Sequence, residues 1–550
     1  MRKYAPTDLI ALDPVWCYSD FEQKAYQMSA EFQRRQIQAV AVWLEDGAKL
    51  ACTLLAAWHA KVRVFFPPNV TQESVAWVSA HADLWLTDVE IHSSLAVYFD
   101  DFGAQQSCQK HAENRPLFDY DNQTEIWLKT SGSTGEAKTI IKTAEQMWLG
   151  AEVLAEALPF KAENNVTAIS TVSIQHIYGL TVHIMMSLVN GWQIGRKQQF
   201  YPECMLAETR NTEQTVIVSS PAMLTRIDWF NTTMPKNIVG VISSGGALPE
   251  ETSEQMRHLL QQPVIEIYGS TETGPIAIRD DIHLWQTLPN SRLGCNEDGA
   301  LWIEGCWLST REQTADVVEF LDGGFRLLGR SDRIVKIGDK RTSLAGIEAK
   351  LNQHAWVEDC YIEQPRLAAW VGLNAQGIDI LRENGRRHLI DQLKAYLAET
   401  QDKTAIPRFW RFTDKLPRNS QSKINKLEFN RTCIEPQREP IWLTEQQTER
   451  HYQATGKVPL DLLYLKDHFA NFPLVPGAIE LQWISDKIKA LVAQDVEFSR
   501  LDKLKFQKFL RPNDSFSLEL NVAEKRDKVT FQLKVENDMC CSGVAVLSYR

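Results

Sequence analysis

The stretch TSGSTGEAKT, residues 130–139, follows the strand-like run EIWLK and is the most informative loop of the sequence. Its glycines, serines and threonines offer backbone N–H groups and hydroxyls to phosphate oxygens, and Lys138 adds a positive charge. A flexible linker can have the same composition. Residues 132–139 also nearly follow the P-loop pattern, from which they depart at Ala137, where that pattern has glycine. The loop alone therefore leaves three interpretations open.

Further stretches toward the C-terminus favour nucleotide binding. VIEIYGSTETG, residues 264–274, is a strand that ends in the aromatic Tyr268 and is followed by a turn of small residues with Glu272. An aromatic ring there can stack on a purine, and a carboxylate beside a phosphate loop can hold Mg²⁺. The other stretches are VISSGGALP (241–249), TADVVEF (314–320), GRSDRIVKIGDKRTSLAGIEAKL (329–351) and KLPRNSQSKINK (415–426). Each is a weak signal alone, but their order along the chain makes a strong one.

Together these stretches resemble the adenylate-forming superfamily of acyl-CoA synthetases, aryl-CoA ligases, luciferases and peptide-synthetase adenylation domains. The resemblance covers about residues 10–435. It implies two half reactions: a carboxylate and ATP form an acyl-adenylate, and a thiol then takes the acyl group. It also implies a nucleotide site, with phosphates held by Ser131, Gly132, Ser133, Thr134, Gly135 and Lys138, adenine by Gly246 and Tyr268, phosphate and Mg²⁺ by Thr271 and Glu272, and ribose by Asp316 and Arg330.

The same resemblance implies four further roles. Asp332 in GRSD matches the hinge about which the small subdomain rotates, and Arg341 matches a second arginine of the family pattern. His176 in IQHIYGL matches the residue near the carboxylate and phosphate end of the acyl pocket. Lys423 matches the lysine that bridges carboxylate and ribose during adenylation, although Ser422 stands where the family usually has glycine. Such cations are needed because a carboxylate that attacks an α-phosphate brings two anions together.

Strand-like and helical runs alternate near the N-terminus, from AVAVWLE (39–45) to LWLTD (84–88). This alternation predicts a largely parallel sheet covered by helices, hence an α/β fold. We expect an adenylation large domain over residues 1–329, a small α+β subdomain over 330–435, a polar linker over 436–447 and a terminal α+β domain over 448–550.

The composition limits the function. A net charge of -11 argues against a broad nucleic-acid surface. The N-terminus has no apolar run long enough for a signal peptide, and no stretch is long enough for a membrane span. Ten scattered cysteines without C-x-x-C pairs favour reduced thiols. We therefore expect a cytoplasmic protein that binds no nucleic acid.

The terminal stretch DHFANFPLVPGAIELQW, residues 467–483, opens an apolar helix that is followed by strand-like runs. This pattern predicts a helix wrapped by an antiparallel sheet. It resembles the hotdog fold of 3-hydroxyacyl-carrier-protein dehydratases, whose signature is a histidine, a Pro-Gly turn and an acid on the helix. The resemblance implies His468 as the base or acid, and the N–H of Gly477, at the positive helix end, as the group that polarises a thioester carbonyl.

The family's acid falls fourteen residues after the histidine, where this chain has Gln482. Glutamine can orient a hydroxyl or a water but cannot give up a proton as a carboxylic acid does. Glu480 is not a simple substitute, because two residues on a helix rotate by about 200°. Asp486, one turn further on, is a better candidate.

The sequence predicts a bifunctional enzyme of fatty-acid or polyene-type assembly. Its first part would activate a fatty or aryl acid with ATP and Mg²⁺ and pass it to CoA or to the phosphopantetheine of an acyl carrier protein. Its terminal domain would dehydrate 3-hydroxyacyl thioesters as a homodimer. A pairing of this kind resembles the ligase and dehydratase components of bacterial aryl polyene clusters. Two alternatives stay open: a ligase whose hotdog domain only binds thioesters and dimerises, and a P-loop ATPase.

Overall fold

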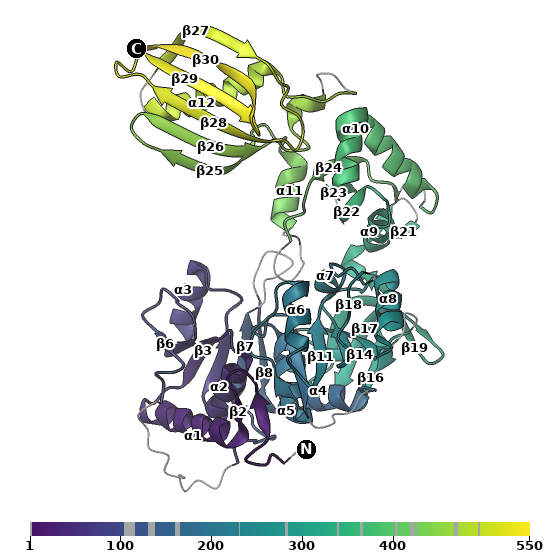
Figure 1. Cartoon of the computed structure of the whole chain (residues 1–550). Helices are drawn as coiled ribbons and strands as arrows, with labels where there is room; N and C mark the ends of the chain where they lie inside the picture. Colours follow the sequence, from purple (N-terminus) through teal and green to yellow (C-terminus); the bar gives the residue numbers. More distant parts are fainter. Residues whose placement is uncertain are drawn as a thin grey trace. The chain divides into compact units, whose positions relative to one another are not determined.

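The computed structural model describes residues 3–103, 116–129, 138–159, 165–229, 231–280, 284–337, 340–363, 367–401, 405–418, 424, 426–466, 471–492 and 496–549. The chain divides into two compact units, Met1–Ser331 and Asp332–Arg550. Figure 1 shows the elements of each unit along the sequence. Within the described residues, no helix is both long and apolar enough to cross a lipid bilayer.

The first unit begins with the predicted alternation of strands and helices. Among the described residues, six strands form a sheet in the order β6-β5-β3-β4-β7-β8, parallel except for β8. Its strands are β3 (Ala39–Trp43), β4 (Arg63–Phe66), β5 (Leu84–Thr87), β6 (Ala96–Tyr98), β7 (Glu125–Lys129) and β8 (Thr139–Thr143). The helices along this part of the chain are α1 (Tyr18–Arg34), α2 (Gly47–His59) and α3 (Gln72–His81). The prediction of an α/β fold is confirmed.

A second sheet of the first unit carries the later motifs. In the described part of the chain its order is β15-β14-β13-β12-β11-β9-β10-β1-β2. Its strands are β1 (Leu9–Ala11), β2 (Trp16–Cys17), β9 (Val166–Ser170), β10 (Gln193–Ile194), β11 (Gln214–Ser219), β12 (Ile238–Ser243), β13 (Val264–Ser270), β14 (Gly274–Arg279) and β15 (Gln286–Thr287). The helices are α4 (Ala144–Ala157), the π-helix η1 (Gly179–Met185), α5 (Met186–Asn190), α6 (Pro202–Thr209), α7 (Pro221–Leu224) and α8 (Glu250–Leu260). Strands β9, β11, β12 and β13 are parallel neighbours, so their carboxyl ends share one edge.

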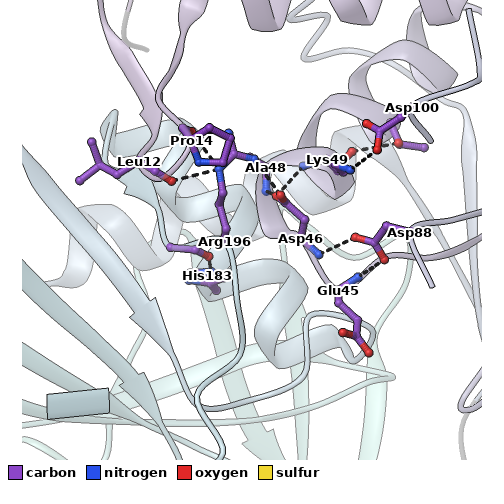
Figure 2. Close-up of polar contacts among 12 residues, drawn as sticks. Leu12, Pro14, Glu45, Asp46, Ala48, Lys49, Asp88, Asp100, His183 and Arg196 are labelled. Atoms are coloured by element: carbon purple, nitrogen blue, oxygen red, sulfur yellow. Dashed lines mark hydrogen bonds and ion pairs between the residues drawn. The ribbon is translucent and has the colours of Figure 1, made fainter. Parts of the chain in front are cut away.

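A buried ion pair connects the two sheets (Figure 2). Arg196 is the second residue after β10, and its Nη1 is 2.7 Å from Oδ2 of Asp46, with the two side chains 8% and 17% exposed. Asp46 also caps α2, because its carboxylate accepts the N–H groups of Ala48 and Lys49. Arg196 donates further to the carbonyls of Leu12 and Pro14. One arginine therefore fixes the start of α2 against the edge of the nine-stranded sheet.

An antiparallel sheet ends the first unit, with β16 (Ser291–Cys295), β17 (Ala300–Gly305), β18 (Glu312–Leu321) and β19 (Gly324–Arg330). The turn η2 (Ser331–Arg333) follows. The second unit then starts with β20 (Ile334–Ile337), β21 (Lys340–Ser343), α9 (Leu344–Asn352), β22 (Val357–Glu363), β23 (Ala368–Leu373), α10 (Ala375–Ala398), β24 (Phe409–Thr413) and α11 (Lys426–Ile434). These elements form a small α+β subdomain around α9, α10 and a three-stranded sheet.

The terminal domain is a long helix packed on an antiparallel sheet, as Figure 1 shows. Its order among described residues is β25-β26-β28-β29-β30-β27. The elements are β25 (Ile441–Gln447), β26 (His451–Lys457), the short 3-10 helix η4 (Leu463–Lys466), α12 (Gly477–Val492), β27 (Val496–Phe506), β28 (Ser515–Val522), β29 (Lys528–Val535) and β30 (Asp538–Tyr549). The predicted hotdog-type arrangement is confirmed.

Two details of the terminal domain differ from the sequence prediction. Residues 441–447, assigned to the linker, form β25 and pair with β26. Leu504 and Phe506 are 37% and 49% exposed, although strand alternation along RLDKLKFQKFL predicts that they face inward. A register shift between Asp502 and Lys505 interrupts the alternation of β27, because Lys503 takes a φ of 54°.

Candidate active site

Four of the predicted nucleotide residues, Gly246, Tyr268, Thr271 and Glu272, lie at the carboxyl ends of β12 and β13. Ligands of open α/β sheets bind outside the carboxyl ends of the strands. Ser244, directly after β12, donates its hydroxyl to the carbonyl of Ile267 at 2.7 Å and so holds the two strand ends together. Gly245 follows with a φ of +87°, which favours glycine. Among the described residues, a Cβ on Gly245 would meet nothing within 4 Å, and one on Gly246 would meet only Pro221 at 3.8 Å. Open space therefore lies beside the glycine pair, where a flat base can enter.

The structure brings three predicted nucleotide residues together. The hydroxyl of Tyr268 donates to Oδ2 of Asp316 at 2.6 Å, and Nη1 of Arg330 lies 3.8 Å from Oδ1 of the same carboxylate. Asp316 and Arg330 are cross-strand partners on β18 and β19. Burial and the Asp316 charge raise the pKa of the Tyr268 hydroxyl. Tyr268 thus stays protonated and orients the carboxylate that is expected to bind ribose.

Thr271 and Glu272 occupy the turn between β13 and β14. Glu272 is exposed and Thr271 is partly exposed, and both carry the oxygen atoms that Mg²⁺ prefers. The described residues contain no cluster of three or more His, Cys, Asp or Glu side chains that could hold a metal by themselves. This donor set fits an ion held by one carboxylate and by oxygens of a phosphate ligand and water.

Lys142 is a residue that the sequence analysis missed. It lies on β8, where only 7% of its surface is exposed, and its Nζ donates to the carbonyl of Glu272 at 2.9 Å. Burial lowers the pKa of this ammonium, and the carboxylates of Glu312 and Glu272 oppose that shift. A lysine on a short strand is ordinarily solvent-exposed, so no sequence signal marked it.

His176 and Lys138 lie elsewhere in the first unit. His176 is partly exposed, and its carbonyl accepts the N–H of Leu180 in η1. Tyr178, two residues later, donates its hydroxyl to the carbonyls of Ser219 and Ile242, at the ends of β11 and β12. The segment of His176 is thereby tied to the edge where the nucleotide residues gather. Lys138 is exposed directly before β8.

Several predicted residues lie outside the described part of the chain or in the second unit. Ser131, Gly132, Ser133, Thr134, Gly135, Lys423 and His468 lie outside the described residues. Arg341 belongs to β21, and Asp332 belongs to η2. The boundary between the two compact units falls between Ser331 and Asp332, at the position predicted to be the hinge.

Helix α12 carries both Gly477 and Gln482, two of the predicted site residues of the terminal domain. It begins at Gly477, where a Cβ would come within 2.7 Å of the Phe506 ring, so only glycine fits there without movement. Pro476 directly precedes the helix. Gln482 is exposed and donates to both carboxylate oxygens of Asp486, at 3.1 and 3.2 Å. Beside it lies a cavity of about 210 Å³, lined by Gln482, Ser485 and apolar side chains that include Phe498 and Phe531.

Glu480 lies on the opposite side of α12 from Gln482. It is 3% exposed, and its Oε2 makes no hydrogen bond within the described structure. Burial raises the pKa of Glu480 to about 7. The expectation that Glu480 cannot stand in for a residue at position 482 agrees with these opposite environments.

These features define a nucleotide-handling α/β enzyme with a hotdog domain at its C-terminus. Residues 5–296, more than half of the chain, match the AMP-binding enzyme family. The chain belongs to this family, which excludes the P-loop alternative. Residues 444–544 match the ApeI dehydratase family, so the terminal domain is an ApeI-like dehydratase domain.

Known proteins resemble the two parts separately. A 4-coumarate–CoA ligase of Cereibacter sphaeroides is 26% identical, over 54% of this chain and 69% of its own. The 3-hydroxyacyl-[acyl-carrier-protein] dehydratase FabZ of Petrotoga mobilis is 27% identical, over 20% of this chain and 88% of its own. The o-succinylbenzoate CoA synthetase of Bacillus subtilis in complex with ATP and magnesium has the same fold, with a TM-score of 0.65 and 19% identity over 77% of this chain and 96% of its own.

Proposed function

We propose that residues 1 to about 435 activate a carboxylic acid, fatty or aryl, with ATP and transfer it to a phosphopantetheine thiol of CoA or an acyl carrier protein. The observation that carries this proposal is the Tyr268, Asp316 and Arg330 cluster beside the open Gly245–Gly246 edge. A hydroxyl, a carboxylate and a guanidinium at the carboxyl ends of parallel strands suit the sugar and phosphate of a nucleotide. The similarity to CoA ligases supports the same chemistry.

Each residue has a distinct part in the adenylation step. Asp316 would accept ribose hydroxyls, and Arg330 would lie beside it. Thr271 and Glu272 would hold Mg²⁺ together with phosphate oxygens, and the ion would neutralise charge that develops on the phosphate. Lys423 would bridge the carboxylate and ribose, and His176 would lie near the acid. Arg341, which belongs to the second unit, is a further residue predicted to bind the nucleotide.

Pyrophosphate exchange tests the ligase. Purified protein with Mg²⁺ and ATP should exchange labelled pyrophosphate only when its acid is present. A screen of aryl acids and of short, medium and long aliphatic acids would identify the substrate class, and product analysis with CoA and with a carrier protein would identify the acceptor. Release of ADP and phosphate in place of AMP and pyrophosphate would contradict the proposal.

The terminal domain, on this proposal, dehydrates 3-hydroxyacyl thioesters as a homodimer. Strand β27 is an edge strand, and Leu504, Phe506 and Phe509 on or after it are exposed apolar residues that a second copy could cover. His468 would then face the partner's Gln482, which is exposed in a single chain. The N–H groups at Gly477, at the positive end of α12, would polarise the thioester carbonyl.

A second candidate function is a domain that binds thioesters and dimerises without catalysis. The glutamine at the acid position favours it, because Gln482 is bonded to Asp486 and cannot protonate a leaving hydroxyl. Hydration of a crotonyl thioester by the intact chain, by His468→Ala and by Gln482→Glu separates the candidates. Wild-type activity that is lost in His468→Ala supports dehydration. An inactive wild type that Gln482→Glu activates supports the binding domain.

Fusion of the two domains favours a shared carrier. Two sites joined by a short linker see a tethered substrate at an effective concentration of about millimolar. A carrier-bound acid could therefore be loaded and later dehydrated on one protein. The narrower proposal is a role in aryl polyene assembly, which the screen with aryl acids tests directly.

A further inference from the structure

Lys142 joins two motifs that are far apart in the sequence. It lies on β8, four residues after Lys138, on the strand that follows the predicted phosphate loop. Its Nζ donates to the carbonyl of Glu272, in the turn predicted to hold phosphate and Mg²⁺, at 2.9 Å. Strand β8 lies in one sheet, and the strands β13 and β14 on either side of this turn lie in another. The hydrogen bond therefore connects the phosphate loop's own strand to the turn of the acidic residue.

A second donor holds the next carbonyl of the same turn. Trp307 is 1% exposed, and its Nε1 donates to the carbonyl of Thr273 at 2.9 Å. Ser270 and Thr273 also exchange bonds, because the N–H of each donates to the hydroxyl of the other at 3.0 and 3.1 Å. Two successive carbonyls are thus fixed by buried side chains from outside the turn. A fixed carbonyl fixes its peptide plane.

The elements that carry these donors are themselves firmly packed. Thr143, the residue after Lys142, caps α4 in a capping box with Gln146. Gln146 donates to the hydroxyl of Ser309, two residues after Trp307. Gly150 of α4 packs against Pro275, the second residue of β14, and against Trp307. The segments that carry Lys142 and Trp307 are therefore both held in place by contacts with α4.

We propose that Lys142 is a positioning residue for the nucleotide site, which holds the Glu272 backbone so that the Thr271 and Glu272 side chains stay turned toward the ligand. The proposal rests on the proposed ligase function. Lys142 is buried and bonded to a backbone carbonyl, so its role is to act through Glu272 and not to contact the nucleotide.

Isothermal titration calorimetry with ATP and Mg²⁺, and with AMP in the absence of metal, tests this role in the full chain. Lys142→Met keeps the apolar stem and removes the donor. We expect it to weaken ATP·Mg²⁺ binding by about fivefold to tenfold, because only part of the free energy of a hydrogen bond to a charged donor is lost from binding when the bond acts through the turn. AMP binding without metal should change less. In pyrophosphate exchange, the Mg²⁺ concentration for half-maximal rate should rise while the rate at saturating Mg²⁺ recovers.

Lys24→Met is the matched control. Lys24 also donates its Nζ to a backbone carbonyl, that of Phe102 at 2.8 Å, but it lies on α1 and does not touch the turn. It should leave both titrations unchanged, so a general loss of stability cannot imitate the expected result. If Lys142→Met does not fold, Trp307→Phe removes the second donor and should raise the Mg²⁺ requirement in the same way.

The outcomes separate this proposal from the proposed function. A wild type that binds neither ATP nor AMP overturns the ligase proposal itself. A wild type that binds ATP·Mg²⁺, with Lys142→Met or Trp307→Phe binding equally well, overturns the positioning role and leaves the ligase proposal intact.

Discussion

Glu480 lies in the core of the terminal domain, where its Oε2 makes no hydrogen bond within the described residues. Burial raises its pKa from the ordinary 4.5 to about 7, and Cys540 and Cys541 are its titratable neighbours. The folded chain therefore keeps a proton that the unfolded chain releases near pH 4.5. Stability should fall as the pH rises from about 4.5 to about 7 and stay level above that, by on the order of 3 kcal/mol in total.

Glu480→Gln should abolish this pH dependence, because an amide does not titrate. We expect the variant to match the wild type near pH 4.5 and to be more stable at pH 8. Hydrogen exchange of peptides from α12, corrected for the intrinsic effect of pH, measures the difference. Glu524→Gln is the control, since the Glu524 side chain is 89% exposed. A wild type whose α12 protection does not change between these pH values would contradict the raised pKa of Glu480.

At the scale of elements, Asp46 combines two stabilising roles at the start of α2. It caps the helix and pairs with Arg196, whose side chain is 8% exposed (Figure 2). Asp46→Ala should cost about 3 kcal/mol, because it removes a helix cap and leaves a buried guanidinium without its carboxylate. Asp46→Asn should cost less, since the amide oxygen can still cap the helix. Thermal unfolding of the three proteins gives the order; equal stability of the alanine variant and the wild type would refute the role of the pair.

The sequence predicted elements wherever hydrophobic periodicity was strong. The strands β3 and β5 lie within two residues of the predicted runs 39–45 and 84–88, because each buries a continuous apolar face. Strand β25 was missed because IWLTEQQ is exposed along almost its whole length at a sheet edge, so no alternation marks it. The nucleotide residues were predicted from sequence motifs. The properties of Lys142 and Glu480, in contrast, depend on the burial of their side chains. Burial of a single charged side chain depends on tertiary packing, which local sequence does not encode.

At the scale of the molecule, the small subdomain and the hotdog domain form one unit. Asp461, before the hotdog helix, lies 2.9 Å from Nε of Arg386 on α10 and 3.2 Å from Nη1 of Arg411 on β24. Arg382 of α10 pairs with Asp514 at 2.7 Å. Leu460 belongs to the core of the small subdomain. These contacts explain why residues 332–550 cluster together.

Asp461→Ala should loosen this unit, because it leaves two arginines without their shared carboxylate. The expected cost is about 2 kcal/mol, below that of a fully buried pair, since the Arg386 side chain is 30% exposed. Limited proteolysis between α11 and β25 should become faster. Asp391→Ala is the control. Asp391 lies on α10, as Arg386 does, and its ion pair with Arg387 is exposed. Unchanged proteolysis in Asp461→Ala would show that other contacts hold the unit.

On the proposed function, a hinge at the boundary between Ser331 and Asp332 would give the two half reactions different requirements. If the second unit turns at Asp332 between them, proline there should restrict the turn, because it fixes φ near −65°. Asp332→Pro should therefore keep acid-dependent pyrophosphate exchange while thiol transfer falls by about tenfold or more. Lys423→Ala should show the opposite pattern, with exchange lost and transfer from a supplied acyl-adenylate largely kept. Rapid-quench measurement of each half reaction in both variants is the test.

Since the hotdog domain belongs to the same unit as the small subdomain, a hinge at Asp332 would also carry the dehydratase domain along. Equal loss of both half reactions in Asp332→Pro would place the hinge elsewhere.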